Sequence, residues 1–216
     1  MTITNEQILQ AITQTLYMVS FSLVIGSLIG IPLGILLAIT RKNGVFENNA
    51  IFLVLSNVIN IVRSLPFIIL LVAVVPFTRI IVGTSIGTSA AIVPLIMYIS
   101  PYIARLVENS LLEVDSGIIE AAEAMGATPL QIIWYFLLPE ALGSLILTLT
   151  TATIGLIGAT AMAGTVGGGG IGDLAISYGY QRFDTLVIVV TVIILIIFVQ
   201  IIQALGNALA KKARRN

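Results

Sequence analysis

The 216-residue sequence contains no cysteine and no histidine. Disulfide bridges are therefore excluded, as are metal sites and catalytic groups that rely on a thiolate or an imidazole. Charged residues are also scarce, at 9% of the chain, compared with about 25% in soluble proteins. Because positive and negative charges cancel to a formal net charge of zero, the sequence offers no electrostatic basis for binding nucleic acid.

Hydrophobic residues make up 58% of the chain. Water cannot solvate a surface so poor in charge, so the composition predicts an all-α polytopic membrane protein with one domain, residues 1–216. The N-terminal sequence MTITNEQILQ has neither a basic segment nor a small-residue cleavage site. We therefore expect the first hydrophobic segment to remain in the mature protein.

A membrane-spanning helix needs about 20 mostly apolar residues. Five stretches with few charges meet this requirement, and the predicted spans are about 14–39, 50–78, 84–106, 139–165 and 185–209. A polar loop at about 108–138 separates the third span from the fourth.

Basic residues predict the orientation, because Lys and Arg concentrate in short cytoplasmic loops. Arg41 and Lys42 follow the first span, Arg105 ends the third, and the basic cluster at 211–215 follows the fifth. We expect the N-terminus outside and the C-terminus and the 108–138 loop in the cytoplasm. The opposite orientation would place most of the ten basic residues outside.

Two features inside the spans predict specific packing. Gly26, Gly30 and Gly34 share one face of the first span and allow another backbone to approach closely. We favour packing within the subunit, with contact to a second copy as the alternative. Pro32 lies in the same helix and is expected to kink it.

Arg63 lies roughly 20 Å along the second predicted span. A charge near the bilayer centre usually faces a cavity or a helix break. The sequence Arg63-Ser64-Leu65-Pro66 contains such a break, because proline disfavours helix at the residue before it. Arg63 either lines a pathway or gate, or belongs to a helix break that is buried in the protein.

The 108–138 loop predicts two short helices that meet at Gly126. Glu120 and Glu123 share a face of the first helix, about 117–125, and Gly126 suits its left-handed C-terminal cap. Their negative charge argues against a connector that rests on anionic lipid, so docking of a soluble partner is favoured.

The second helix is expected to begin with Thr128 as N-cap, Pro129 at the first position and Gln131 completing a capping box. It should run to about Leu137, and Pro139 should end it and start the fourth span.

The loop resembles the signature of inner-membrane permeases of bacterial ABC importers. The matching residues are Glu120-Ala121-Ala122, then Gly126, then Phe136-x-Leu138-Pro139, with Phe136 replacing the usual Ile. This resemblance implies a type I ABC importer permease core with five transmembrane helices and a cytoplasmic coupling-helix loop. It also implies a permease homodimer, two cytoplasmic ATPase subunits and an extracytoplasmic substrate-binding protein.

The resemblance assigns ATPase coupling to residues of this loop, namely Glu120, Ala121, Ala122, Glu123, Ala124, Met125, Gly126, Leu138 and Pro139. It leaves ATP and Mg²⁺ to the partner ATPase, so the chain itself is expected to be non-catalytic. Consistent with this, the glycine run 167–170 lacks the Lys-Ser/Thr of a phosphate-binding loop.

Three stretches, 63–95, 102–132 and 161–180, are similar to the methionine-import branch of this family. The implied substrate is methionine, and the implied location is the bacterial inner membrane. Permeases for glycine betaine, other amino acids and phosphonates share the loop and remain alternatives.

Met162 is the one large flexible side chain in a small-residue stretch of the fourth span. We expect it to close the pathway, with filling of a gap between helices as the alternative. Beyond that span, Gly168, Gly170, Tyr178 and Arg182 are candidates for the seat of the binding protein. Tyrosines are nevertheless common at any membrane boundary.

Two other classes of function fit the sequence less well. A stand-alone secondary transporter would need intramembrane carboxylates for its coupling ion, and none is found well inside a predicted span. An intramembrane enzyme would need a nucleophile with a base or a metal, and histidine and cysteine are absent. Neither class explains the polar loop.

Overall fold

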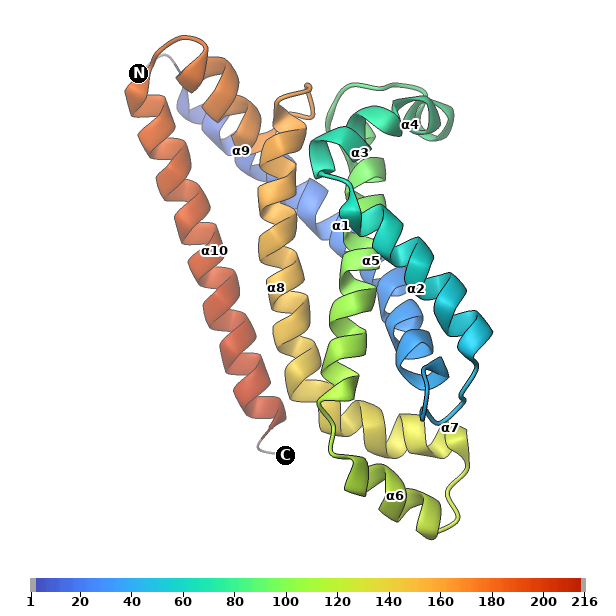
Figure 1. Ribbon diagram of the computed structural model, residues 1–216. Coiled ribbons are helices and arrows are strands. Elements are labelled where there is room, and N and C mark those ends of the chain that lie inside the picture. The colour runs from blue at the N-terminus through green and yellow to red at the C-terminus, as the bar shows by residue number, and fades with distance from the viewer. Residues whose placement is uncertain (1–2, 215–216) are drawn as a thin grey trace.

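The computed structural model describes residues 3–214, and within that range it contains helices and no strand. Four helical segments are long and apolar enough to cross a membrane: α1 (Asn5–Thr40), α5 (Thr88–Leu112), the segment Pro129–Gly164, and α10 (Thr185–Ala213). Figure 1 shows α5, α8 and α10 in a row, with α1 crossing at an angle. The expected all-α membrane fold is confirmed.

The region predicted as the second span, 50–78, is not one straight helix. It consists of α2 (Asn49–Ser64) and α3 (Phe67–Ala73), bent by 101° at the intervening residues, and it leads into α4 (Val75–Val82). Pro66 explains the break, because its ring disfavours helix at Leu65 and it has no N–H to donate. Only if the bent pair counts as one span does the number of spans reach five.

The bend also changes the position inferred for Arg63. Arg63 is the penultimate residue of α2, next to the break. A single straight helix over the predicted span 50–78 would place Arg63 near the middle of that helix. The sequence did predict the break, and Arg63 lies beside it.

Helix α1 packs tightly along α5 through its glycine face. A Cβ built on Gly30 would lie 2.6 Å from the carbonyl oxygen of Ser100, and one on Gly34 would lie 2.5 Å from that of Ala104. Gly26 likewise faces Ile99. The prediction of packing within the subunit is confirmed, and these glycines are not available to a second copy.

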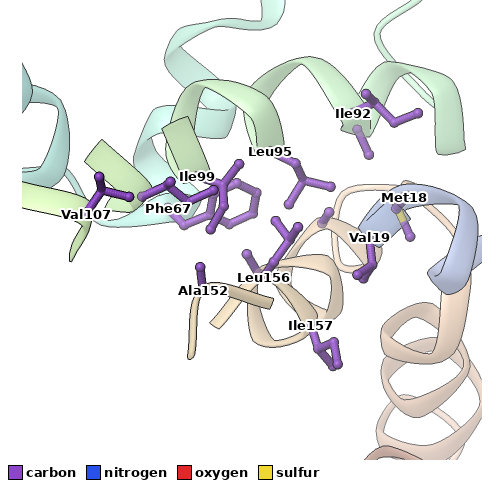
Figure 2. Packing of buried hydrophobic residues seen from close by; sticks show 14 of the residues in the cluster. Met18, Val19, Phe67, Ile92, Leu95, Ile99, Val107, Ala152, Leu156 and Ile157 are labelled. Atoms are coloured by element: carbon purple, nitrogen blue, oxygen red, sulfur yellow. The ribbon is translucent and has the colours of Figure 1, made fainter. Parts of the chain in front are cut away.

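The hydrophobic core lies between α1, α5, α8 (Leu138–Gly164) and α3. Figure 2 shows Leu95 and Ile99 of α5 facing the side of α8 that carries Ala152 and Leu156, with Phe67 of α3 beside them. Leu95, Ile99, Ala152 and Leu156 are fully buried. The core therefore holds the bent α2–α3 segment against the two central helices.

Helix α5 extends six residues beyond the predicted end of the third span at 106. Arg105, which was expected to end that span, lies inside the helix and forms a 2.6 Å ion pair with Glu108. Its other guanidinium nitrogen donates to Ser56 Oγ at 2.9 Å and Asn60 Oδ1 at 2.8 Å, both on α2. Glu108 lies near the end of α5, outside the predicted span, and it is buried and paired with Arg105.

The two ends of the helix bundle differ. One end carries α6 (Ser116–Ala124), α7 (Pro129–Gln131) and the end of α10. The other carries the start of α1, α4, α9 (Gly170–Asp173) and the π-helix η2 (Leu174–Tyr180). The α6–α7 unit projects beyond the long helices in Figure 1.

The prediction that the second helix of the loop ends at Pro139 is wrong. The π-helix η1 (Ile132–Leu137) joins α7 directly to α8, so the segment 129–164 has no non-helical residue. Pro139 cannot donate an α-helical hydrogen bond and would clash with the carbonyl one turn earlier. A π-helical turn, in which Leu138 N–H bonds to Ile133 O, widens the helix just before the proline.

Candidate functional site

The α6–Gly126–α7 unit, residues 116–131, forms an elbow. Gly126 has φ 80°, and its N–H bonds to Glu123 O at 2.9 Å. Ala127 N–H bonds to Ala122 O at 3.0 Å. These two bonds make a Schellman cap, which fixes the angle at which the chain leaves α6.

The start of each arm is capped by a side chain. Asp115 Oδ1 accepts a 2.7 Å bond from Gly117 N–H at the start of α6, a cap that the sequence reading missed. Gln131 Oε1 accepts from Thr128 N–H at 2.8 Å, which is the Gln half of the predicted capping box. Both arms are therefore held in fixed directions.

The outer surface of the elbow is uncovered by the rest of the chain. Ala122 is fully buried and anchors α6, whereas Ala121 and Ala124 are exposed together with Glu120 and Glu123. A helix that presents small side chains between two carboxylates can enter a narrow groove on a partner.

Large apolar side chains extend this surface along the second arm. Trp134 and Tyr135 of η1 are 64% and 73% exposed, and Met125 and Leu130 are exposed beside the turn. The sequence reading did not single out the two aromatic residues. The missed signal was their position in the polar loop, where an apolar side chain without a partner in the same chain indicates an interface.

A second candidate site is a groove of about 520 Å³ at the α2–α3 bend. Arg63 and Met162, which the sequence reading connected with a pathway, both line it. The other lining residues are Ser64, Leu65, Pro66, Phe67, Ile68, Tyr98, Gly155, Gly158 and Ala159. The bend thus places Arg63 opposite the small-residue face of α8.

An aromatic ladder supports the cationic end of this groove. The rings of Phe67 and Tyr98 meet edge to face at 5.3 Å, and Tyr98 stacks on Tyr102 at 6.2 Å. The guanidinium carbon of Arg63 lies 5.9 Å from the centre of the Tyr102 ring. This cation–π distance positions the charge without neutralising it.

The α8 wall of the groove is open. A Cβ at Gly158 would meet no heavy atom within 4 Å, and one at Gly155 would just reach Tyr102 at 4.0 Å. Met162, one turn further along α8, is 50% exposed. Its side chain is therefore not packed between helices of the same chain.

The predicted seat for a binding protein separates into two parts. Gly168 and Gly170 are buried; Gly168 N–H bonds to Ala163 O at 3.0 Å, and Gly170 N–H to Gln14 Oε1 at 2.8 Å. They fold the loop onto α8 and α1 and are not a contact surface. Tyr178 and Arg182 lie together, with the guanidinium carbon 4.3 Å from the ring centre, and Arg182 is exposed.

Comparison with known proteins supports one family. Residues 30–215 match the family described as binding-protein-dependent transport system inner membrane component. A probable D-methionine transport system permease protein MetI from Vibrio cholerae serotype O1 is 51% identical over 208 residues, or 96% of this chain and 92% of the relative. Its counterpart from Haemophilus influenzae is 49% identical, covering 92% and 93%.

A solved structure of the MetNI methionine ABC transporter in inward-facing conformations superposes with a TM-score of 0.94 at 44% identity. The match covers 98% of this chain and 99% of that chain. An amino acid ABC transporter at 20% identity and TM-score 0.74 shares the fold. By sequence and structure, the chain belongs to the inner-membrane components of binding-protein-dependent transport systems.

Proposed function

We propose that this chain is the permease subunit of an ATP-driven importer for methionine. The observation that carries the substrate assignment is the match over almost the whole chain to the MetNI methionine transporter and to two MetI relatives. The chain is a multi-pass, non-catalytic membrane subunit. Energy would come from a separate ATPase that binds ATP and Mg²⁺.

The partners follow from the same family. Two copies of the permease would form the pathway, two ATPase subunits would dock on the two elbows, and a binding protein would deliver the solute from outside. The exposed face of Glu120, Ala121, Glu123 and Ala124 supports docking at the elbow. Tyr178 and Arg182, at the opposite end of the bundle, support a contact with the binding protein.

The distribution of charge supports an orientation with the elbow in the cytoplasm. Arg41 and Lys42 follow α1 at the elbow end, and Lys211, Lys212 and Arg214 end α10 there. Arg79 and Arg182 lie at the other end. Because basic residues favour the cytoplasmic side, we place the N-terminus outside and the C-terminus inside.

The pathway would run along the groove at the α2–α3 bend. Arg63 and Met162 line it, and the exposed Met162 would close it near the two-fold axis of the dimer. The open face of Gly155 and Gly158 leaves space for a passing solute.

The function is tested by reconstituting the permease with its ATPase and binding protein in liposomes. We expect ATP-dependent accumulation of labelled methionine, competed by unlabelled methionine and not by glycine betaine or phosphonate. Competition by those solutes in place of methionine would change the substrate. Accumulation by the permease alone would overturn the importer assignment.

Docking at the elbow is tested at Gly126. Gly126→Val places a β-branched residue at φ 80° and should break the Schellman cap, at a cost of about 1–2 kcal/mol. Gly126→Asn is the matched control, because Asn tolerates this conformation. We expect the Val variant to reach the membrane but lose co-purification with the ATPase, while the Asn variant retains it. Equal co-purification would contradict the role of the elbow.

A further inference from the structure

We propose that Arg63 binds the carboxylate of the transported solute, in a binding site within the groove at the α2–α3 bend. This inference rests on the proposed function and adds a substrate-binding site inside the permease. The solute class is a small carboxylate with an apolar side chain, such as an α-amino acid. Its carboxylate would meet the Arg63 guanidinium, and its side chain would lie toward Met162.

The first observation is an arginine without an anion. Within residues 3–214 no carboxylate forms an ion pair with Arg63, whereas Arg105 is paired with Glu108. A cation in a membrane protein that faces a cavity marks a substrate or ion pathway. Arginine, with its planar fork of donors, is the side chain best suited to hold a carboxylate by two parallel hydrogen bonds.

The second observation is the polarity of the groove. Arg63 and Ser64 supply polar groups at one end, where the chain turns. The other lining residues are mostly apolar, and Phe67, Ile68 and Met162 give a hydrophobic wall. Sites of this size, with apolar walls and a few polar groups, are typical of small-molecule binding.

The third observation is that the charge is held in place. Arg63 lies over Tyr102, which stacks on Tyr98, and Tyr98 packs against the buried ring of Phe67. The α2–α3 break is therefore tied to α5 by aromatic contacts on both sides of Pro66. Fixing Arg63 before the solute arrives reduces the entropy lost on binding.

The chain offers a clean reporter, because it contains no cysteine. Ser64 lines the groove next to Arg63 and is exposed, so Ser64→Cys places a single thiol at the site. The assay uses the permease–ATPase complex in lipid nanodiscs and follows modification of the permease by an anionic and a cationic methanethiosulfonate. Protection is measured with methionine and with methioninol, which lacks the carboxylate.

We expect methionine to slow labelling by roughly threefold or more, and methioninol to have little effect, because the carboxylate contact supplies much of the binding. In the Arg63→Gln background, methionine protection and the preference for the anionic reagent should both disappear. Arg79→Gln, which removes an exposed arginine outside the groove, is the control and should keep both.

Equal protection by methionine and methioninol, or protection that persists in Arg63→Gln, would overturn the assignment. If Arg63→Gln fails to assemble, Arg63→Lys decides: it keeps the charge but loses the fork, so weaker protection supports the site and unchanged protection opposes it. These outcomes leave methionine uptake by the unmodified transporter intact. Failure of that uptake would instead overturn the proposed function.

Discussion

Gly30 of α1 faces the backbone of Ser100 in α5 at a distance that leaves no room for a side chain: an added Cβ would lie 2.6 Å from the Ser100 carbonyl oxygen. Ile103 lies equally close, with its Cβ at 2.8 Å from the same position. The close packing of α1 against α5 at this point therefore depends on the absence of a side chain at Gly30.

Gly30→Ala should destabilise the permease by about 1–3 kcal/mol, because the backbone of α5 cannot move aside without losing its own packing. Gly158→Ala is the matched control for stability, since its Cβ would meet no heavy atom within 4 Å. Thermal unfolding in detergent should show a lower midpoint for the first variant and an unchanged or higher midpoint for the second. Similar midpoints would contradict the close approach of the helices.

Glu108→Gln and Arg105→Gln should each be strongly destabilising. Arg105→Gln leaves the buried Glu108 carboxylate without compensation, which typically costs about 3–5 kcal/mol, and Glu108→Gln leaves the partly buried Arg105 without its counter-ion. Arg105→Gln also removes the bonds from Arg105 to Ser56 and Asn60, so in this variant α2 should loosen from α5.

The double variant Arg105→Met, Glu108→Leu removes both charges together and should recover much of the loss. Denaturant unfolding of Arg105→Met, of Glu108→Leu and of the double variant, with the same replacements throughout, measures the coupling. Additive effects would show that the pair does not act as a unit.

Gly158→Leu should fill the groove at the α2–α3 bend and block transport. The cost of crowding a solute there, about 1–3 kcal/mol, corresponds to a loss of uptake of roughly 5-fold to 150-fold. Thr151→Leu adds a similar side chain to an exposed position of the same helix outside the groove. Methionine uptake and ATPase co-purification should be measured together. Normal uptake in Gly158→Leu would exclude the groove as the pathway.

Met162→Ala should raise the passive leak of methionine through the assembled transporter, because the gate loses its mobile side chain. Met97→Ala makes the same chemical change on α5 at a residue outside the groove. Efflux from preloaded liposomes without ATP is the measurement. A leak that rises equally in both variants would indicate general loosening of the bundle.

Local signals predicted the elbow well. The cap at Gly126, the capping-box glutamine at Gln131 and the break before Pro66 all depend on backbone chemistry within a few residues. Such features are readable because the residues that cause them are neighbours in the sequence. The glycine face of α1 was also readable, since helical periodicity alone places Gly26, Gly30 and Gly34 together.

Features that depend on tertiary contacts were harder to predict. The third span was ended at 106 because Arg105 reads as a loop charge, but Glu108, Ser56 and Asn60 supply partners that keep it inside the fold. The sequence predicted a break before Pro66, but it did not predict the size of the bend between α2 and α3, which is 101°. Arg63 and Met162 are almost a hundred residues apart, and that they line one groove likewise follows from packing of α3 on α8.

The unbroken helix from the elbow to Gly164 has a mechanical consequence. Pro139 and Met162 are separated by about 35 Å along that helix. If the elbow end stays in place and α8 tilts by roughly 5°, simple trigonometry on that length moves Met162 sideways by about 3 Å. Small angular changes of α8 about its elbow end are thus enlarged at Met162, and this movement needs no melting of α8.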